Sequence, residues 1–139
     1  MMQIGEFSSR TGVSIDTLRY YEKIGLISPK RRNQQRFYGD QDLELILTIN
    51  KLKQMNFGLK DIKKILYFDQ KLEEGLSEGR LPPEIMEESL TMFKRKLQEV
   101  EEKEKELKDV KLLLRHIMDK ITALEKRAQE EDRKGENEK

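Results

Sequence analysis

A seven-residue hydrophobic repeat in the second half of the chain restricts the possible folds more than any other feature. From Glu84 onward, an apolar residue recurs at every seventh position, and Lys and Glu are the most frequent residues between. This spacing is typical of a helix that pairs with another helix in a coiled coil. The repeat consists of Met86, Phe93, Val100, Leu107, Leu114, Ile121 and Ala128.

A second set of apolar positions accompanies the repeat and changes side near Glu104, as a three- or four-residue discontinuity would produce. One helix alone cannot bury such a stripe, so we expect a partner chain. We predict a dimerisation helix over 84–128 and a charged, flexible tail over 129–139. The dimerisation residues are predicted to be Phe93, Val100, Leu107, Val110, Leu114, Ile117, Ile121 and Leu124.

The charge of the chain is unevenly distributed. The 139 residues carry a net charge of +1, with 40% charged and 35% apolar residues. Residues 1–68 hold 12 Lys and Arg against 7 Asp and Glu, so they carry +5, whereas the remainder carries −4. A basic half that also bears most turn signals suggests a nucleic-acid-binding module joined to a second element.

Several classes of protein are excluded or disfavoured by composition. The absence of Cys excludes disulfides, thiolate metal sites and thiol switches, and fits a reducing compartment. No apolar run is long enough to span a bilayer, and the first residues do not resemble a signal peptide. We therefore expect a soluble, cytoplasmic protein with no membrane association.

Short helices with clear end signals are predicted in residues 1–68. A helix over 4–10 ends at Gly12, and Ser14 is a suitable N-cap for a second helix over 15–24 that Gly25 ends. Two helices joined by so short a turn form a helix-turn-helix. In the second helix, Leu18 and Tyr21 share one face, whereas Arg19 and Tyr20 point away from it.

A hairpin and two further helices are predicted next. Pro29 ends helical structure, and the polar run that follows leads into a short strand at 36–38, which indicates a wing-like hairpin. Gly39 and Asp42 suit the start of a third helix, which ends at 56–58, and a fourth helix is expected at about 59–68. The Gly and Pro residues of 69–83 predict a linker with at most one helical turn.

The order of the residue types in the first part resembles a known family. The residues are Ile4-Gly5-Glu6-Phe7, Gly12-Val13-Ser14, Thr17-Leu18-Arg19-Tyr20-Tyr21-Glu22, Gly25-Leu26-Ile27, Pro29, Arg36-Phe37-Tyr38, Asp42-Leu43 and Phe57-Gly58-Leu59-Lys60-Asp61-Ile62. They closely resemble the DNA-binding domain of the mercury-resistance-regulator (MerR) family of bacterial transcription regulators. The resemblance covers about residues 3–68, followed by a long helix similar to the family's dimerisation helix.

This resemblance implies a mainly α fold, with a winged helix-turn-helix and a long helix that forms an antiparallel coiled coil between two subunits. It also implies a homodimer that binds an inverted repeat in promoter DNA and distorts it so that RNA polymerase can engage both promoter elements. The DNA-binding residues implied are Ser14, Asp16, Thr17, Arg19, Tyr20, Tyr21, Arg31, Arg32, Arg36, Tyr38 and Lys60. For Tyr21, core packing and a phosphate contact both stay open, and for Lys60 and the cluster at 30–32 a purely solvated position is the alternative.

Departures from the family pattern suggest a short form without a sensor. Asn33-Gln34-Gln35-Arg36 replaces the common Asn-Gly-Tyr-Arg turn, Asn56 stands where a Gly is usual, and Gly58 where a Ser or Thr is usual. The Cys ligands of metal-sensing relatives, the reactive Cys of thiol sensors and the separate ligand domain of drug sensors are all missing. The aromatic residues Tyr67, Phe68 and Phe93 either line a small cavity or dock the two parts of the chain together.

We expect no enzymatic activity and no cofactor or metal. The sequence contains no nucleophile–base arrangement, phosphate loop or zinc spacing, and His116 is alone. The alternative to a regulator is a structural DNA-anchoring protein whose coiled coil recruits a non-transcriptional partner.

Overall fold

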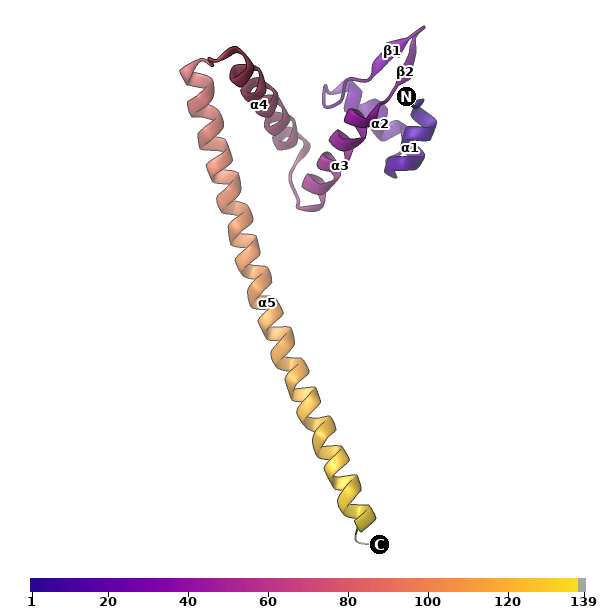
Figure 1. Cartoon of the computed structure of the whole chain (residues 1–139), viewed down its shortest axis with the longest axis vertical. Coiled ribbons are helices and arrows are strands. Elements are labelled where there is room, and N and C mark those ends of the chain that lie inside the picture. The colour runs from indigo at the N-terminus through magenta and orange to yellow at the C-terminus, as the bar shows by residue number, and fades with distance from the viewer. Residues whose placement is uncertain (138–139) are drawn as a thin grey trace. The chain divides into compact units, whose positions relative to one another are not determined.

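The computed structural model describes residues 1–137, which form seven helices and strands (Figure 1). The chain divides into two compact units, Met1–Ser89 and Leu90–Lys139, and each is described by itself. The fold is mainly helical, as predicted, with one small antiparallel sheet.

The helix-turn-helix is formed by α1 (Ile4–Thr11) and α2 (Ile15–Lys23). Gly12 ends α1 with φ 72°, a left-handed conformation that glycine adopts without steric cost. The Ser14 hydroxyl caps α2 by accepting a 3.1 Å hydrogen bond from the backbone N–H of Thr17. Both predicted end signals are therefore confirmed.

The wing is a hairpin of β1 (Lys30–Arg32) and β2 (Gln35–Phe37), in which Arg31 lies opposite Arg36. Asn33 and Gln34 make its two-residue turn with φ 51° and 66°. Positive φ at both central residues is the geometry of a type I′ turn, which matches the twist of the strands. The turn thus forms although Gln34 is not a glycine.

The helices α3 (Asp40–Gln54) and α4 (Leu59–Glu78) follow the wing. The Gly39 N–H donates a 2.8 Å hydrogen bond to the Asp42 carboxylate, which confirms the predicted half of a capping box. Asn56 adopts φ 66° in the turn between the helices, and Gly58 caps α4 without a side-chain hydrogen bond.

The linker predicted for 69–83 is wrong over most of its length, because α4 continues to Glu78. Gly75 is buried inside this helix, and a Cβ there would lie 3.1 Å from Cβ of Leu81. The glycine thus permits close packing of the turn after α4 instead of breaking the helix. Only residues 79–82 lie between α4 and the next helix, and Gly79 ends α4 with φ 78°.

The core of the first unit lies between α1, α2, the wing and the α3–α4 pair. Phe7, Leu18, Ile46, Ile49 and Ile62 are fully buried in it. The core also contains Met2, Tyr21, Leu26, Ile27 and Tyr38. Met2 pairs with Tyr38 through two backbone hydrogen bonds of 2.7 Å, so the N-terminal segment borders the wing.

The last helix, α5 (Pro83–Asn137), has 55 residues, which corresponds to about 80 Å at 1.5 Å per residue. Residues 129–137, for which a charged, flexible tail is predicted, continue this helix, while residues 138 and 139 lie outside the described part. Lys, Glu, Arg and Gln are strong helix formers, which explains the continuation. In residues 1–137, no helix has a stretch long and apolar enough to cross a membrane.

Candidate nucleic-acid interface

The outward face of α2 presents residues predicted to face DNA. Leu18 and Tyr21 are buried on the core face, whereas Arg19 and Tyr20 are exposed, Tyr20 to 51%. Ser14 and Asp16 are also exposed at the start of α2, and Thr17 is half-buried. The inference that this helix has one core face and one free polar face is confirmed.

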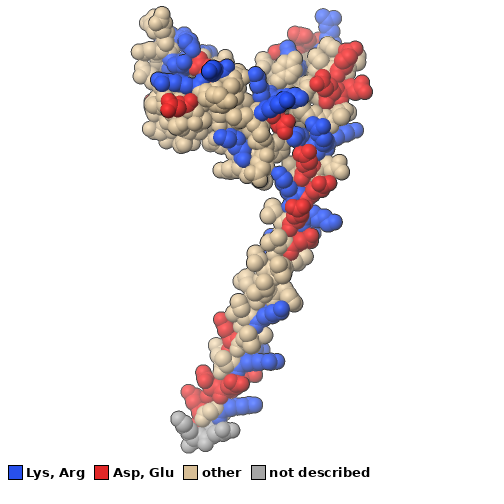
Figure 2. All heavy atoms as spheres, turned by 180° about the vertical axis from the view of Figure 1, so that it is seen from behind, with Lys and Arg blue, Asp and Glu red and all other residues tan. Residues whose placement is uncertain are grey.

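The wing supplies a cluster of cations. Lys30, Arg31 and Arg32 are all exposed on β1. They line a hollow of about 490 Å³ together with Met1 and Phe37. In Figure 2, Lys and Arg side chains with a few acidic ones among them lie over the part of the first unit at the upper left, and α5 carries both basic and acidic side chains. Clustered cations on an exposed surface suit a polyanionic ligand.

One carboxylate joins the wing to α2. Glu22 accepts a 2.5 Å hydrogen bond from Nη2 of Arg31 and a second from Nε of Arg36. Its side chain is 17% exposed. Burial alone would raise the pKa of the Glu22 carboxyl, but the hydrogen bonds and charges of the two arginines outweigh it and hold the pKa below its usual value.

Tyr38 is in the core and not on the DNA-facing surface, so its predicted backbone contact is wrong. Its side chain is fully buried, and its ring stacks on Phe7 with 4.3 Å between centroids. The hydroxyl has no hydrogen-bond partner in the described part of the chain. Burial, together with the nearby charge of Glu22, raises the pKa of this phenol above its usual value.

Tyr21 also packs in the core, with only 1% of its surface exposed. Its hydroxyl accepts a 3.0 Å hydrogen bond from Nζ of Lys53 on α3. The core alternative for Tyr21 therefore holds in this structure, and Lys53 supplies its polar partner. Lys60, by contrast, is exposed at the second position of α4.

Sequence reasoning missed the contacts of two residues beside the candidate interface, namely Glu22 and Lys53. Each forms its contact with a residue far along the chain, so helical spacing gives no sign of it. The signals available for Glu22 were its place in the family motif and its opposite charge to the wing that follows.

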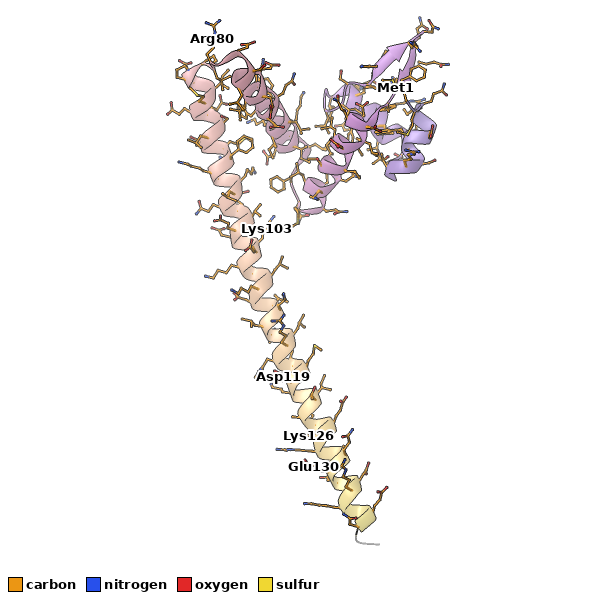
Figure 3. The ribbon with its side chains drawn as sticks, viewed as in Figure 1. Met1, Arg80, Lys103, Asp119, Lys126 and Glu130 are labelled. Carbon is orange, nitrogen blue, oxygen red and sulfur yellow. The ribbon has the colours of Figure 1, made fainter. Side chains whose placement is uncertain are left out.

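The predicted dimerisation residues lie on α5 without cover from their own chain over most of its length. Phe93 and Val100 are half-buried, whereas Leu107, Val110 and the later members are between 42% and 64% exposed. Figure 3 shows side chains projecting from every side of the helix around Asp119. The exposed later members are Leu114, Ile117, Ile121 and Leu124.

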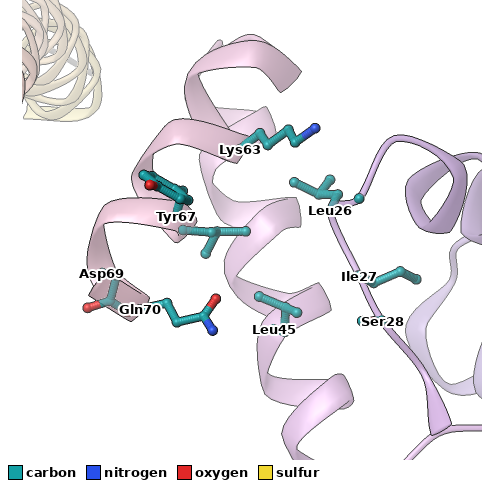
Figure 4. A pocket seen from close by; sticks show the side chains of 10 residues that line it. Leu26, Ile27, Ser28, Leu45, Lys63, Tyr67, Asp69 and Gln70 are labelled. Carbon is teal, nitrogen blue, oxygen red and sulfur yellow. The ribbon is translucent and has the colours of Figure 1, made fainter. Parts of the chain in front are cut away.

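A hollow of about 400 Å³ lies within the first unit, between the loop after α2, α3 and α4. In Figure 4, Lys63 extends past Leu26 at its upper edge, while Asp69 and Gln70 lie at its lower edge. Tyr67 lines this hollow, and Phe68 is buried beside it, with 5.5 Å between the two ring centroids. In residues 1–137, no three His, Asp or Glu side chains gather as a metal site would require.

Comparisons with known proteins agree with this geometry. Residues 2–68 match the MerR HTH family regulatory protein. The uncharacterised HTH-type transcriptional regulator YyaN of Bacillus subtilis (strain 168) is 32% identical over 115 residues, which cover 79% of this chain and 83% of YyaN. The HTH-type transcriptional regulator ZntR of Escherichia coli (strain K12) is 30% identical, over 86% of this chain and 79% of ZntR.

A solved structure is also similar. The transcription regulator PbrR691 from Ralstonia metallidurans CH34, in complex with lead(II), aligns with a TM-score of 0.49 and 27% identity, over 78% of this chain and 84% of PbrR691. The family match and the two relatives, together with the helix-turn-helix and its wing, lead to one conclusion. The chain belongs to the MerR family of helix-turn-helix regulatory proteins, which are DNA-binding transcription regulators and not enzymes.

Proposed function

We propose that the protein binds an inverted-repeat promoter operator as a homodimer and distorts the DNA between the half-sites. The observation that carries this proposal is the free polar face of α2, with Arg19 and Tyr20 exposed beside an arginine-bearing wing. A helix of this kind fits the major groove, where side chains contact base edges, while cations on the wing contact phosphates.

The roles within the interface differ by position. Arg19 and Tyr20 contact bases, and Ser14, Asp16 and Thr17 lie at the end of α2 that enters the groove first. Arg32 and Lys60, both exposed, contact phosphates on either side. Arg31 contacts phosphate from the wing, and Arg36 holds the wing to α2.

Dimerisation is supported by the exposed seam of α5. Leu107 is 61% exposed and Leu114 is 55% exposed, one heptad apart. An apolar stripe of this kind is stable in water when a second helix covers it, and an antiparallel second copy supplies a matching stripe. The two-fold symmetry of such a dimer corresponds to an inverted repeat, and distortion of the intervening DNA brings RNA polymerase into register with both promoter elements.

The proposal is tested first at Arg19. Wild-type protein selects a duplex from a random pool, and Arg19→Ala should weaken binding to that duplex by about 10- to 100-fold, as expected for loss of one good base contact. The matched control is Lys126→Ala, which removes one cation opposite the seam of α5. Equal affinity of Arg19→Ala and wild type in a gel-shift titration would exclude α2 as the recognition helix.

The seam is tested by replacing Leu107 and Leu114 together with Lys. The dimer should dissociate, because four charged side chains would enter one apolar interface. Sedimentation equilibrium measures the outcome, and binding to a single half-site should persist, although more weakly. A dimer that survives both substitutions would show that the interface lies elsewhere.

A DNA-anchoring role is the second candidate function, and Leu112 is the observation that favours it. Leu112 is 56% exposed and lies opposite the seam, so a second copy paired along the seam leaves it uncovered. A recruited partner would cover this side. A genome-wide occupancy map separates the two functions, since a regulator occupies one or two promoters whereas an anchor occupies many scattered sites.

A further inference from the structure

A single carboxylate contacts both strands of the wing. Glu22 accepts hydrogen bonds from Arg31 on β1 and from Arg36 on β2. These two arginines lie directly opposite each other in the hairpin. Like charges at such a position repel each other, so the carboxylate also removes a repulsion within the wing.

The two ion pairs differ in exposure. The side chain of Arg36 is 29% exposed, whereas that of Arg31 is 54% exposed. An exposed ion pair is weak, because water solvates both charges almost as well as they solvate each other. The pair with Arg36 therefore holds the wing on α2, and the pair with Arg31 is the one that another anion can displace.

A DNA phosphate is such an anion. Carboxylate and phosphate both accept the forked hydrogen bonds of a guanidinium group, so Arg31 binds one of them at a time. We propose that Glu22 competes with DNA phosphate for Arg31, and that Arg31 changes partner only on the correct operator. The proposal rests on the proposed function, since it requires the wing to lie along the DNA backbone.

The consequence is a contribution to specificity. On the operator, the base contacts of α2 hold the wing against one particular phosphate, so that phosphate replaces Glu22 at Arg31. On DNA of another sequence these base contacts do not form, so no phosphate is held against the wing. Arg31 then stays paired with Glu22. Glu22 is then a specificity-determining positioning residue, because it lowers affinity for DNA of the wrong sequence.

The dependence of affinity on salt measures this exchange directly. Each phosphate neutralised contributes about −0.9 to the slope of log K against log[salt] on duplex DNA. Two probes are required: a duplex selected by the wild type from a random pool, and a scrambled duplex of equal length and composition. Wild type should show one more phosphate contact on the selected duplex than on the scrambled one.

Glu22→Gln should bind the scrambled duplex with a slope steeper by about 0.9, which corresponds to about eightfold tighter binding near 0.1 M salt. Its slope on the selected duplex should not change. Adding Arg31→Ala to Glu22→Gln should restore the wild-type slope on scrambled DNA. Glu44→Gln, on the exposed surface of α3, is the control for removal of one negative charge.

Arg31→Ala alone is a second test that keeps the Glu22–Arg36 pair and thus the attachment of the wing. It should flatten the slope on the selected duplex by about 0.9 and leave the slope on scrambled DNA unchanged. Equal changes on both probes for either variant would overturn the proposal and leave Glu22 as a structural tether. Failure of the wild type to select any duplex would instead overturn the proposed function.

Discussion

The wing turn offers a substitution whose effect on stability follows from backbone geometry. Gln34 has φ 66°, a left-handed conformation that costs a residue with a Cβ about 1–2 kcal/mol. A glycine at this position would avoid the steric cost, but it would also lose about 0.5–1 kcal/mol more conformational entropy on folding. The difference between the steric cost and the entropy cost predicts that Gln34→Gly raises the free energy of unfolding by about 0.5–1 kcal/mol.

The same turn contains its own control. Asn33 has φ 51°, but asparagine tolerates the left-handed region, so Asn33→Gly relieves little steric strain while glycine still loses more conformational entropy on folding. This substitution should therefore leave the free energy of unfolding unchanged or lower it by up to about 1 kcal/mol. Thermal unfolding followed by near-ultraviolet circular dichroism reports on the first unit, because Tyr21 and Tyr38 are buried in its core. For a unit of this size, the gain for Gln34→Gly corresponds to a melting temperature higher by about 2–8 °C. Equal shifts for both variants, or a loss for Gln34→Gly, would refute the reasoning.

Two further predictions concern packing and pH. Gly75→Ala should lower the free energy of unfolding by about 1 kcal/mol, because the new Cβ would lie 3.1 Å from Cβ of Leu81 and overpacking outweighs the better helix propensity of Ala. A melting experiment measures this loss, and a stabilising Gly75→Ala would contradict the close approach. The pKa of Glu22 is lower in the folded protein than its usual value of 4.5, so its ion pairs stabilise the fold fully above that pH and lose their effect as the pH falls through the folded value. Glu22→Gln should therefore be about 1 kcal/mol less stable than wild type at neutral pH, and the loss is small because Arg31 is largely solvated. This difference in stability should vanish in strong acid. A difference that does not depend on pH would show that charge is not its origin.

Local signals in the sequence predicted most of the first unit. Gly12 and Ser14 placed the turn of the helix-turn-helix, since the left-handed conformation and the N-cap hydrogen bond each depend on one residue and its neighbours along the chain. The separation of Leu18 from Arg19 followed from helical periodicity alone. The resemblance to the MerR family came from the same residues and is shown by the comparisons.

The length of α4 could not be predicted in this way. Gly75 is a poor helix former, and together with Gly79, Pro82 and Pro83 it indicated a linker. Its role depends on Leu81, which packs against the bare backbone once the chain has turned back. Packing between the helix and that turn outweighed the local preference.

The sequence by itself determined the order of the helices, the position of the turns and the face of α2 that stays free, because these depend on backbone preferences and on residues three or four positions apart. Only the tertiary structure decided that Tyr38 lies inside the core and that Glu22 pairs with both wing arginines. Those contacts join residues 9 to 31 positions apart, and their free energy appears only when the wing, α1 and α2 come together. A pattern along the chain shows which side chains are available for such contacts, whereas the folded arrangement selects the partners.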